Sequence, residues 1–281
     1  MSSLKIAVVG SVNLDVLGKP AGPFKPRDSL IGSVQFRCGG VGHNIAAQAV
    51  RTGADVSLYT VFSQDGNGDW LIQACLNEGI RIDHCPRVSE ASSVYLAIHD
   101  QAGDMLAAIN DMGLISALTP AVLDQMIPSI NTCNVCVFDA NLSEECMERL
   151  CSTVTAPLVC DPVSAVKSKR VLPFLKKLSA IKPNLLEAIE MTGASTPEEC
   201  AEQLIMKGVQ SVFVSLGKEG LYYASENSNG FVSPPRVSTA VQTGAGDALT
   251  AGIAYGIGSN KSVKECALLG METVSRFLHI K

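Results

Sequence analysis

The amino-acid sequence predicts an α/β fold, in which a mostly parallel β-sheet has helices packed against both of its faces. Short, continuously apolar segments alternate along the chain with longer segments whose apolar residues recur at helical spacing. Strands that are apolar throughout are typical of parallel sheets, because helices cover both sides of such sheets. With 281 residues, 47% of them hydrophobic, the chain is long enough to form one large core. We therefore expect a single domain over residues 1–281.

The individual elements follow from this alternation. Apolar runs of strand length predict strands at Leu4–Val9, Asp55–Val61, Val135–Phe138, Leu158–Cys160, Ala180–Ile181, Ser211–Val214 and Leu221–Ala224. The segments between them favour helices near His43–Thr52, Gly68–Glu78, Glu144–Ser152, Leu185–Thr192, Pro197–Lys207, Ala245–Gly256 and Val263–Leu278.

Two segments interrupt the alternation. Asp15–Arg37 is rich in Pro and Gly and contains the strand-like piece Ser29–Phe36. Val94–Ile109 has the pattern of two short strands around a turn at Asp100–Gly103. These insertions, at about 15–37 and 94–111, predict a small antiparallel sheet that projects from the main body. We expect this sheet to act as a lid over the ends of the parallel strands.

Composition and charge exclude several classes of function. The net charge is −5 and there is no basic tract, which argues against a nucleic-acid partner. No apolar run approaches the roughly 20 residues of a membrane span, so we expect no membrane association. Residues 1–5 lead directly into a predicted strand, without the apolar core of a signal peptide. We therefore expect a cytoplasmic protein.

The ten cysteines are spread through the predicted strands and helices, which indicates reduced core thiols. The pair Cys133 and Cys136 has the spacing of a metal or redox site, but there is no second such pair. The four histidines show no ligand spacing either. The sequence therefore does not predict a zinc site.

The segment Thr243-Gly244-Ala245-Gly246-Asp247, which precedes an apolar run, is the strongest chemical signal in the chain. A helix that starts here offers unpaired backbone amides and the positive end of its dipole to a phosphate. The small residues let a ligand approach those amides. Asp247 in the first turn can take a proton from a hydroxyl group while the amides stabilise a phosphoryl group. A simple turn or helix cap has the same pattern.

Ligands of open α/β sheets bind at the carboxyl ends of the strands, so the residues that follow strands are candidates. Asn13 and Asp15, after the first strand, alternate along an extended segment and suit paired sugar hydroxyls, although a polar turn explains them equally well. Gly39, Gly40 and Asn44 precede the next helix. They match a site where the backbone closely approaches a small ligand better than they match a dinucleotide-binding fingerprint.

Later strand ends add further candidates. Asn184 is well placed as an N-cap with Glu187 as its capping-box partner, while a carboxylate beside a phosphate can also organise Mg²⁺ through water. The segment from Ser215 to Gly220 has little side-chain bulk and can line a nucleotide cleft. Asp65, in the turn Ser63–Asp69, is best explained as a helix cap.

In this order, the motifs resemble those of the ribokinase-like (pfkB) family of sugar and nucleoside kinases over nearly the whole chain. They are Asn13-Leu14-Asp15, Gly39-Gly40-Val41-Gly42-His43-Asn44, Asp65-Gly66-Asn67-Gly68, Lys182-Pro183-Asn184 with Glu187, Ser215-Leu216-Gly217 and Gly244-Ala245-Gly246-Asp247. The resemblance implies a three-layer α/β/α ribokinase-like fold with a β-sheet lid. It also implies transfer of the ATP γ-phosphoryl group to a primary hydroxyl.

The resemblance also implies roles for the residues. Asp247 would be the base, and the amides of Ala245, Gly246 and Asp247, with Gly244, would form the anion hole. The remaining roles fall to two groups of residues. The acceptor substrate would be held by Asn13, Asp15, Gly39, Gly40 and Asn44; ATP would be held by Asn184, Ser215, Gly217, Gly220 and Thr243, with Glu187 at Mg²⁺.

Within the family, Ala107–Met112 is most similar to pseudouridine kinases, which phosphorylate the 5′-hydroxyl of that nucleoside. The similarity implies that Asn110 and Asp111 meet the base or ribose. A kinase for ribose, fructose or adenosine, and a non-catalytic nucleoside-binding protein, remain alternatives.

Two departures from the family pattern change expectations. Val241 stands where members usually have an acidic or small polar residue that binds a monovalent cation, so K⁺ activation stays open. The sequence ends at Lys281, earlier than members commonly do, so we expect altered adenine contacts.

Lid sheets of the family often meet another subunit, which implies a homodimer.

Overall fold

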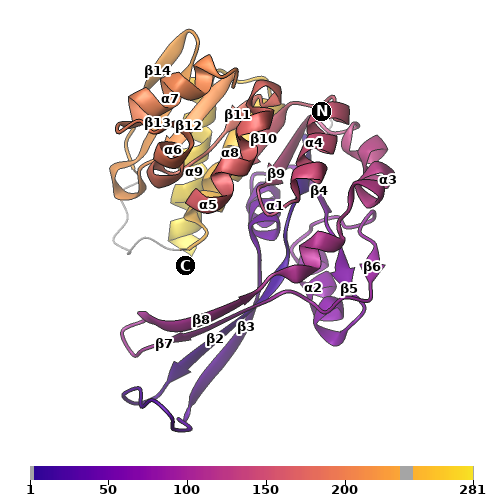
Figure 1. The fold of residues 1–281 in the computed structure, drawn as a ribbon, viewed down its shortest axis with the longest axis vertical. Helices are drawn as coiled ribbons and strands as arrows, with labels where there is room; N and C mark the ends of the chain where they lie inside the picture. The colour runs from indigo at the N-terminus through magenta and orange to yellow at the C-terminus, as the bar shows by residue number, and fades with distance from the viewer. Residues whose placement is uncertain (1–2, 235–242, 281) are drawn as a thin grey trace.

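The computed structural model describes residues 3–234 and 243–280, and Figure 1 shows their arrangement. Within these described residues, eight strands form the main sheet in the order β14-β13-β12-β11-β10-β9-β1-β4. Their bounds are β1 Lys5–Val9, β4 Asp55–Tyr59, β9 Val135–Asp139, β10 Leu158–Asp161, β11 Ala180–Ile181, β12 Ser211–Ser215, β13 Leu221–Ser225 and β14 Ser228–Val232. The six strands β12, β11, β10, β9, β1 and β4 run parallel to one another, and β13 and β14 add an antiparallel edge.

Helices cover both faces of this sheet, which makes three layers. One core cluster contains side chains of α3 Pro120–Ile130, α4 Glu144–Thr153, α6 Leu185–Thr192 and α7 Pro197–Met206. A second cluster, on the opposite face, contains side chains of α1 Val41–Arg51, α2 Gly66–Asn77, α8 Ala245–Gly258 and α9 Val263–Ile280. Successive strand residues alternate between the two clusters, as the continuous apolar strands predict.

The small sheet is present and projects from the body as an arm (Figure 1). It consists of β2 Asn13–Pro20, β3 Gly32–Gly39, β7 Val94–His99 and β8 Met105–Asp111, in the order β3-β2-β7-β8. The prediction of a purely antiparallel sheet is wrong, because β2 and β7 pair in parallel. Each insertion is an antiparallel hairpin, and the first strands of both hairpins leave the body in the same direction.

The predicted strands and helices of the body are confirmed, with ends that differ by a few residues. Helix α3 was not predicted from the sequence, because its internal Pro128 counts against a helix, although Thr119 and Pro120 are typical of a helix start. The sequence reasoning also missed β14, a strand of mixed exposure at the sheet edge, and the short α5 Ala165–Ser168. The remaining elements are a two-stranded sheet of β5 Phe62–Ser63 with β6 Arg87–Val88, and 3-10 helices at Gly113–Ala117, Lys169–Lys177 and Gly217–Glu219.

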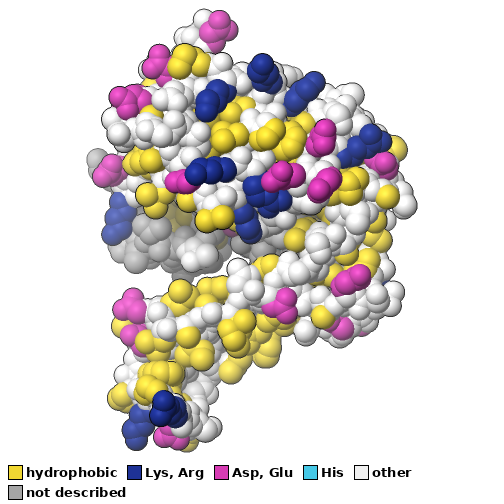
Figure 2. Space-filling model, viewed as in Figure 1, with side chains coloured by type: hydrophobic (Ala, Val, Ile, Leu, Met, Phe, Trp, Pro, Cys, Tyr) yellow, Lys and Arg dark blue, Asp and Glu magenta, His cyan; other side chains and the backbone are white. Residues whose placement is uncertain are grey.

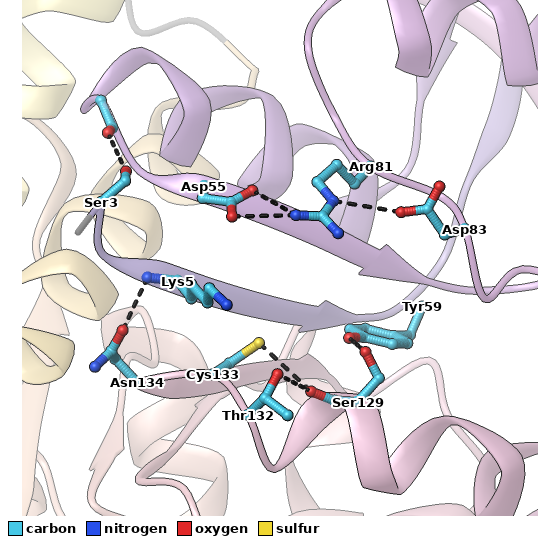
Figure 3. Close-up of polar contacts among 11 residues, drawn as sticks. Ser3, Lys5, Asp55, Tyr59, Arg81, Asp83, Ser129, Thr132, Cys133 and Asn134 are labelled. Atoms are coloured by element: carbon cyan, nitrogen blue, oxygen red, sulfur yellow. Dashed lines mark hydrogen bonds and ion pairs between the residues drawn. The ribbon is translucent and has the colours of Figure 1, made fainter.

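Polar contacts near β1 and β4 tie several loops to the body (Figure 3). Arg81 forms ion pairs with Asp55 at 3.2 Å and with Asp83 at 3.3 Å. The Tyr59 and Ser129 hydroxyl oxygens lie 2.8 Å apart, which connects β4 to the end of α3.

Among the helices that the structure describes, none is long and apolar enough to cross a membrane.

Candidate active site

A cavity of about 880 Å³ lies between the small sheet and the carboxyl ends of the parallel strands. From the small sheet, its lining includes Asp15, Leu17, Arg37, Tyr95, His99, Met105 and Asn110. From the body, it includes Ser11, Asn44, Asn141, Asp161, Lys167, Lys182, Asn184, Glu187, Ser215, Thr243, Gly244, Gly246 and Asp247. Figure 2 shows the arm separated from the body by an open notch. Residues from both ends of the chain therefore face one space.

The start of α8 forms one end of this cavity. Gly244 is the N-cap and has a φ of 98°, a left-handed conformation that suits glycine. The first intrahelical hydrogen bond here is from the Ala248 amide to the Gly244 carbonyl at 3.0 Å. The amides of Ala245, Gly246 and Asp247 belong to the first turn, where a helix has no carbonyl partners for them. They are therefore placed to bind an anion.

Asp247 has an unusual electrostatic environment. Its Oδ2 atom accepts a hydrogen bond of 2.8 Å from Asn44 Nδ2, which comes from α1. Burial, followed by the nearby Asp161 carboxylate, raises the pKa of Asp247 to about 7, although Asn44 and Lys182 act in the opposite direction. A carboxyl group with a pKa near neutrality can accept and release protons at physiological pH.

Lys182 provides a buried cation next to this carboxyl group. Its Nζ atom lies 3.0 Å from Asp161 Oδ2, which also accepts a hydrogen bond of 2.8 Å from Thr250 Oγ1. Burial disfavours the ammonium ion, but Asp161, Glu187 and Asp247 together raise the pKa of Lys182 above its ordinary value. Lys182 therefore remains charged. Lys182 directly follows β11, so the strand-end rule that identifies Asn184 applies to Lys182 as well, although the sequence motif alone assigns it no role.

Asn184 and Glu187 form the predicted capping box at the start of α6. The backbone N–H of Asn184 donates a hydrogen bond of 2.9 Å to Glu187 Oε2, and the side-chain Nδ2 of Asn184 donates one of 2.8 Å to Glu187 Oε1. Both residues also line the cavity, and burial raises the pKa of Glu187. A carboxylate near a phosphate site is the kind of group that Mg²⁺ binds while it keeps most of its waters. These residues therefore fit both the capping role and the Mg²⁺ role.

At the base of the small sheet, Asn13 Nδ2 donates a hydrogen bond of 2.6 Å to Asp15 Oδ1. Burial raises the pKa of Asp15. A Cβ atom on Gly39 would lie 2.5 Å from Asp15 Oδ2, and one on Gly40 would lie 2.5 Å from the Ser11 carbonyl oxygen. These glycines therefore make room for the protein's own atoms. Gly40 lines the cavity, whereas Gly39 is not part of its lining.

The other predicted residues divide between the cavity and its surroundings. Asn110, Ser215 and Thr243 line it. Asp111 is exposed and not part of the lining, because adjacent strand residues point to opposite faces of the small sheet. Gly217 and Gly220 are also outside the lining, and Gly220 (φ 102°) forms the turn between β12 and β13. Val241 lies outside the described residues.

Several cavity residues were not predicted from the sequence, among them Ser11, Asn141 and Lys167. Asn141 Nδ2 donates to Ser11 Oγ at 3.0 Å, and Lys167 Nζ donates to Asn141 Oδ1. Ser11 is held in turn by the buried carboxylate of Asp139, which accepts a hydrogen bond of 2.9 Å from the Ser11 amide. Asn141 follows β9, so the strand-end rule could have found it. The sequence contains no comparable signal for Lys167.

Comparison with known proteins identifies similar chains. The family model described as "pfkB family carbohydrate kinase" matches residues 3–275. The pseudouridine kinase of Escherichia coli is 34% identical over 89% of this chain and 82% of its own length. The guanosine-inosine kinase of Exiguobacterium acetylicum is 25% identical over 98% of this chain and 94% of its own.

Among solved structures, that of a putative sugar kinase from Clostridium perfringens superimposes with a TM-score of 0.86. It is 26% identical and the match covers 99% of this chain and 90% of the other.

The raised pKa of Asp247 predicts a pH-dependent effect on stability. The pKa of Asp247 is about 7 in the folded protein and 3.8 in the unfolded chain, so ionisation of Asp247 lowers the free energy of unfolding. This loss of stability is absent below about pH 4 and complete above about pH 7. We expect Asp247→Asn to raise the thermal midpoint by a few degrees at pH 8 and by less at pH 5. Differential scanning calorimetry of both proteins at the two pH values measures this. A variant less stable than wild type at pH 8 would contradict the assigned environment.

Proposed function

The chain belongs to the pfkB family of carbohydrate kinases, and we propose that it transfers the γ-phosphoryl group of ATP to the 5′-hydroxyl of a nucleoside, pseudouridine. Membership of the family makes it a phosphotransferase with a hydroxyl group as acceptor. The observation that carries the proposal is the position of Asp247. A carboxyl group with a pKa of about 7 lies in the first turn of α8, beside amides suited to an anion.

In the proposed reaction, the carboxylate of Asp247 takes the proton of the substrate hydroxyl. The hydroxyl oxygen attacks the γ-phosphorus, and the bond from that phosphorus to the bridging oxygen of ADP breaks. The amides of Ala245, Gly246 and Asp247 and the ammonium group of Lys182 stabilise the charge on the phosphoryl oxygens. When bound, Mg²⁺ would neutralise phosphate charge, held through water by Glu187 and Asn184. Val241 offers no side-chain ligand, so the proposal includes no monovalent cation.

Hydrogen bonding by Asn44 explains how Asp247 stays in place. The Asn44 amide donates to one carboxylate oxygen of Asp247, which leaves the other oxygen for the substrate hydroxyl. Ser215 and Thr243 line the cavity on the body side, where we place the nucleotide.

The acceptor substrate would lie under the small sheet. Asn13, Asp15 and Asn110 line this part of the cavity and offer the donors and acceptors that a ribose and a base require. Two relatives named as nucleoside kinases support this class of substrate, and the similarity to the Escherichia coli pseudouridine kinase supports pseudouridine. Asp111 and Gly39 are not needed for this arrangement.

A substrate panel tests the proposal. Incubation with Mg-ATP and, separately, with pseudouridine, uridine, guanosine, adenosine, ribose and fructose should yield ADP and a 5′-phosphate with pseudouridine at the highest kcat/KM. Asp247→Asn should lower kcat at least 1,000-fold and leave pseudouridine affinity nearly unchanged. Turnover of ribose without turnover of pseudouridine would refute the substrate. Binding of pseudouridine by the wild type without any ADP formation would instead favour a non-catalytic binding protein.

The pH dependence of catalysis tests the role of Asp247 as base. Because the carboxylate must be ionised, kcat/KM should rise about tenfold per pH unit below 7 and level off above it. The hydrogen bond from Asn44 stabilises the ionised form of Asp247. Asn44→Ala removes it and should therefore move the midpoint of the pH profile to a higher pH. Steady-state rates between pH 5 and 9 provide both values. A midpoint below pH 5 in the wild type would exclude Asp247 as the titrating base.

The outer face of the small sheet supports the expected homodimer. Phe36, Leu96 and Ile109 lie on the face opposite to Asp15 and Asn110, and Phe36 and Ile109 are 59% and 65% exposed. Figure 2 shows hydrophobic side chains gathered on the arm. An apolar face of this kind is typical of interaction surfaces. We propose that it packs against the same face of a second copy.

Analytical ultracentrifugation tests the homodimer. The wild type should sediment as a dimer and the Phe36→Lys, Ile109→Lys double variant as a monomer. Met206→Lys, which changes an exposed methionine on α7, should remain dimeric. Equal sedimentation of all three proteins as monomers would refute the dimer.

A further inference from the structure

Three side chains with donor atoms for a soft metal ion meet at the base of the small sheet. Cys38 comes from β3, His43 from α1 and Cys75 from α2, and one donor atom of each lies within 4.8 Å of the others. Within residues 3–234 and 243–280, this is the one group of three or more such residues with this geometry.

The chemistry of this group suits Zn²⁺. Two thiolates and an imidazole are among its preferred ligands, whereas Mg²⁺ and Ca²⁺ prefer oxygen. Cys75 and His43 are buried, which excludes competing water. Cys38 is half-buried and, like His43, lines the cavity, so an ion can reach the group from that side.

A carboxylate stands behind the imidazole, as it does at many zinc sites. Glu78 Oε2 lies 3.0 Å from His43 Nε2, and the Glu78 side chain is about 39% exposed. An outer carboxylate of this kind fixes the orientation of a ligating histidine and makes it a stronger donor. His43 Nδ1 lies 3.3 Å from Asn44 Oδ1, a longer contact that an ion can replace.

The two thiols also interact with each other. A hydrogen bond with Cys38, and to a lesser degree the charge of His43, lowers the pKa of Cys75. The same interaction and burial raise the pKa of Cys38. An ion that binds both sulfurs would displace the protons of both thiols.

We propose that Cys38, His43 and Cys75 bind one Zn²⁺ ion, with water in the fourth position. Binding forms two sulfur–zinc bonds and one nitrogen–zinc bond, releases the thiol protons to solvent, and involves no oxidation or reduction. The ion would join the small sheet to α1 and α2. The proposal is independent of the substrate of the enzyme.

Titration of the full chain with Co²⁺, a spectroscopic substitute for Zn²⁺, tests the site in the presence of a phosphine reductant. The wild type should bind one Co²⁺ with a near-ultraviolet thiolate-to-metal absorption band, and one equivalent of Zn²⁺ should abolish that band. Cys38→Ser and Cys75→Ser should each weaken binding at least tenfold. Cys133→Ser, which changes a half-buried cysteine outside the group, should bind as the wild type does. Circular dichroism shows whether each variant is folded.

A second measurement needs no variant. Zn²⁺ should slow the alkylation of the half-buried Cys38 by iodoacetamide, as mapped by mass spectrometry, and leave that of Cys133 unchanged. Absence of the thiolate band, equal Co²⁺ affinity in the wild type and both serine variants, or an unprotected Cys38 would each overturn the proposal. None of these readouts depends on kinase activity.

Discussion

The hydrogen bond from Asn44 on α1 to Asp247 on α8 joins two residues that are 203 positions apart in the chain, and the rest of the site depends on it. It forms because α1 lies close to the first strand: a Cβ atom on Gly42 would lie 2.6 Å from the Gly10 carbonyl carbon. Any larger residue at position 42 would push α1 outward and move Asn44 away from α8. The glycine-rich segment before α1 thus acts through packing, not only through contact with a ligand.

The second constraint is electrostatic. Asp161, Glu187 and Asp247 gather around a single buried cation, Lys182. Burial of several carboxylates is costly unless cations and hydrogen bonds offset it, and here one ammonium group serves all three. The result is an asymmetric distribution of charge. Asp161 is paired directly with Lys182 and Thr250, whereas Asp247 is left with a raised pKa and is the group available to exchange protons.

Much of this arrangement could be predicted from the sequence, because it is encoded locally. The continuous apolar strands predict a parallel sheet, and its carboxyl ends bring Asn13, Asn184 and Asp247 to one edge. The capping box of Asn184 and Glu187 is likewise a local pattern, and the structure contains it. Helix α3 was missed, since local rules count its internal Pro128 against a helix while the buried Leu123, Met126 and Ile130 hold it in place.

The features that sequence reasoning missed depend on contacts between distant segments. No spacing rule connects Cys38, His43 and Cys75, which meet only after β3, α1 and α2 have packed together. Lys167 is similar, because its contact with Asn141 depends on how α5 lies beside the loop that follows β9. The side of the small sheet that Asp111 occupies follows from strand register, which the sequence does not show.

The small sheet is attached to the body at one end only, and it carries Asp15 and Asn110 while the body carries Asp247 (Figure 1). Asp15 and Asn110 lie near the base of this sheet, whereas His99 and Met105, which also line the cavity, lie near its tip. A rotation of a few degrees at the base therefore displaces His99 and Met105 much more than it displaces Asp15 and Asn110. Leverage of this kind adjusts the outer part of the cavity to acceptors of different size, with the chemical groups around Asp247 unchanged.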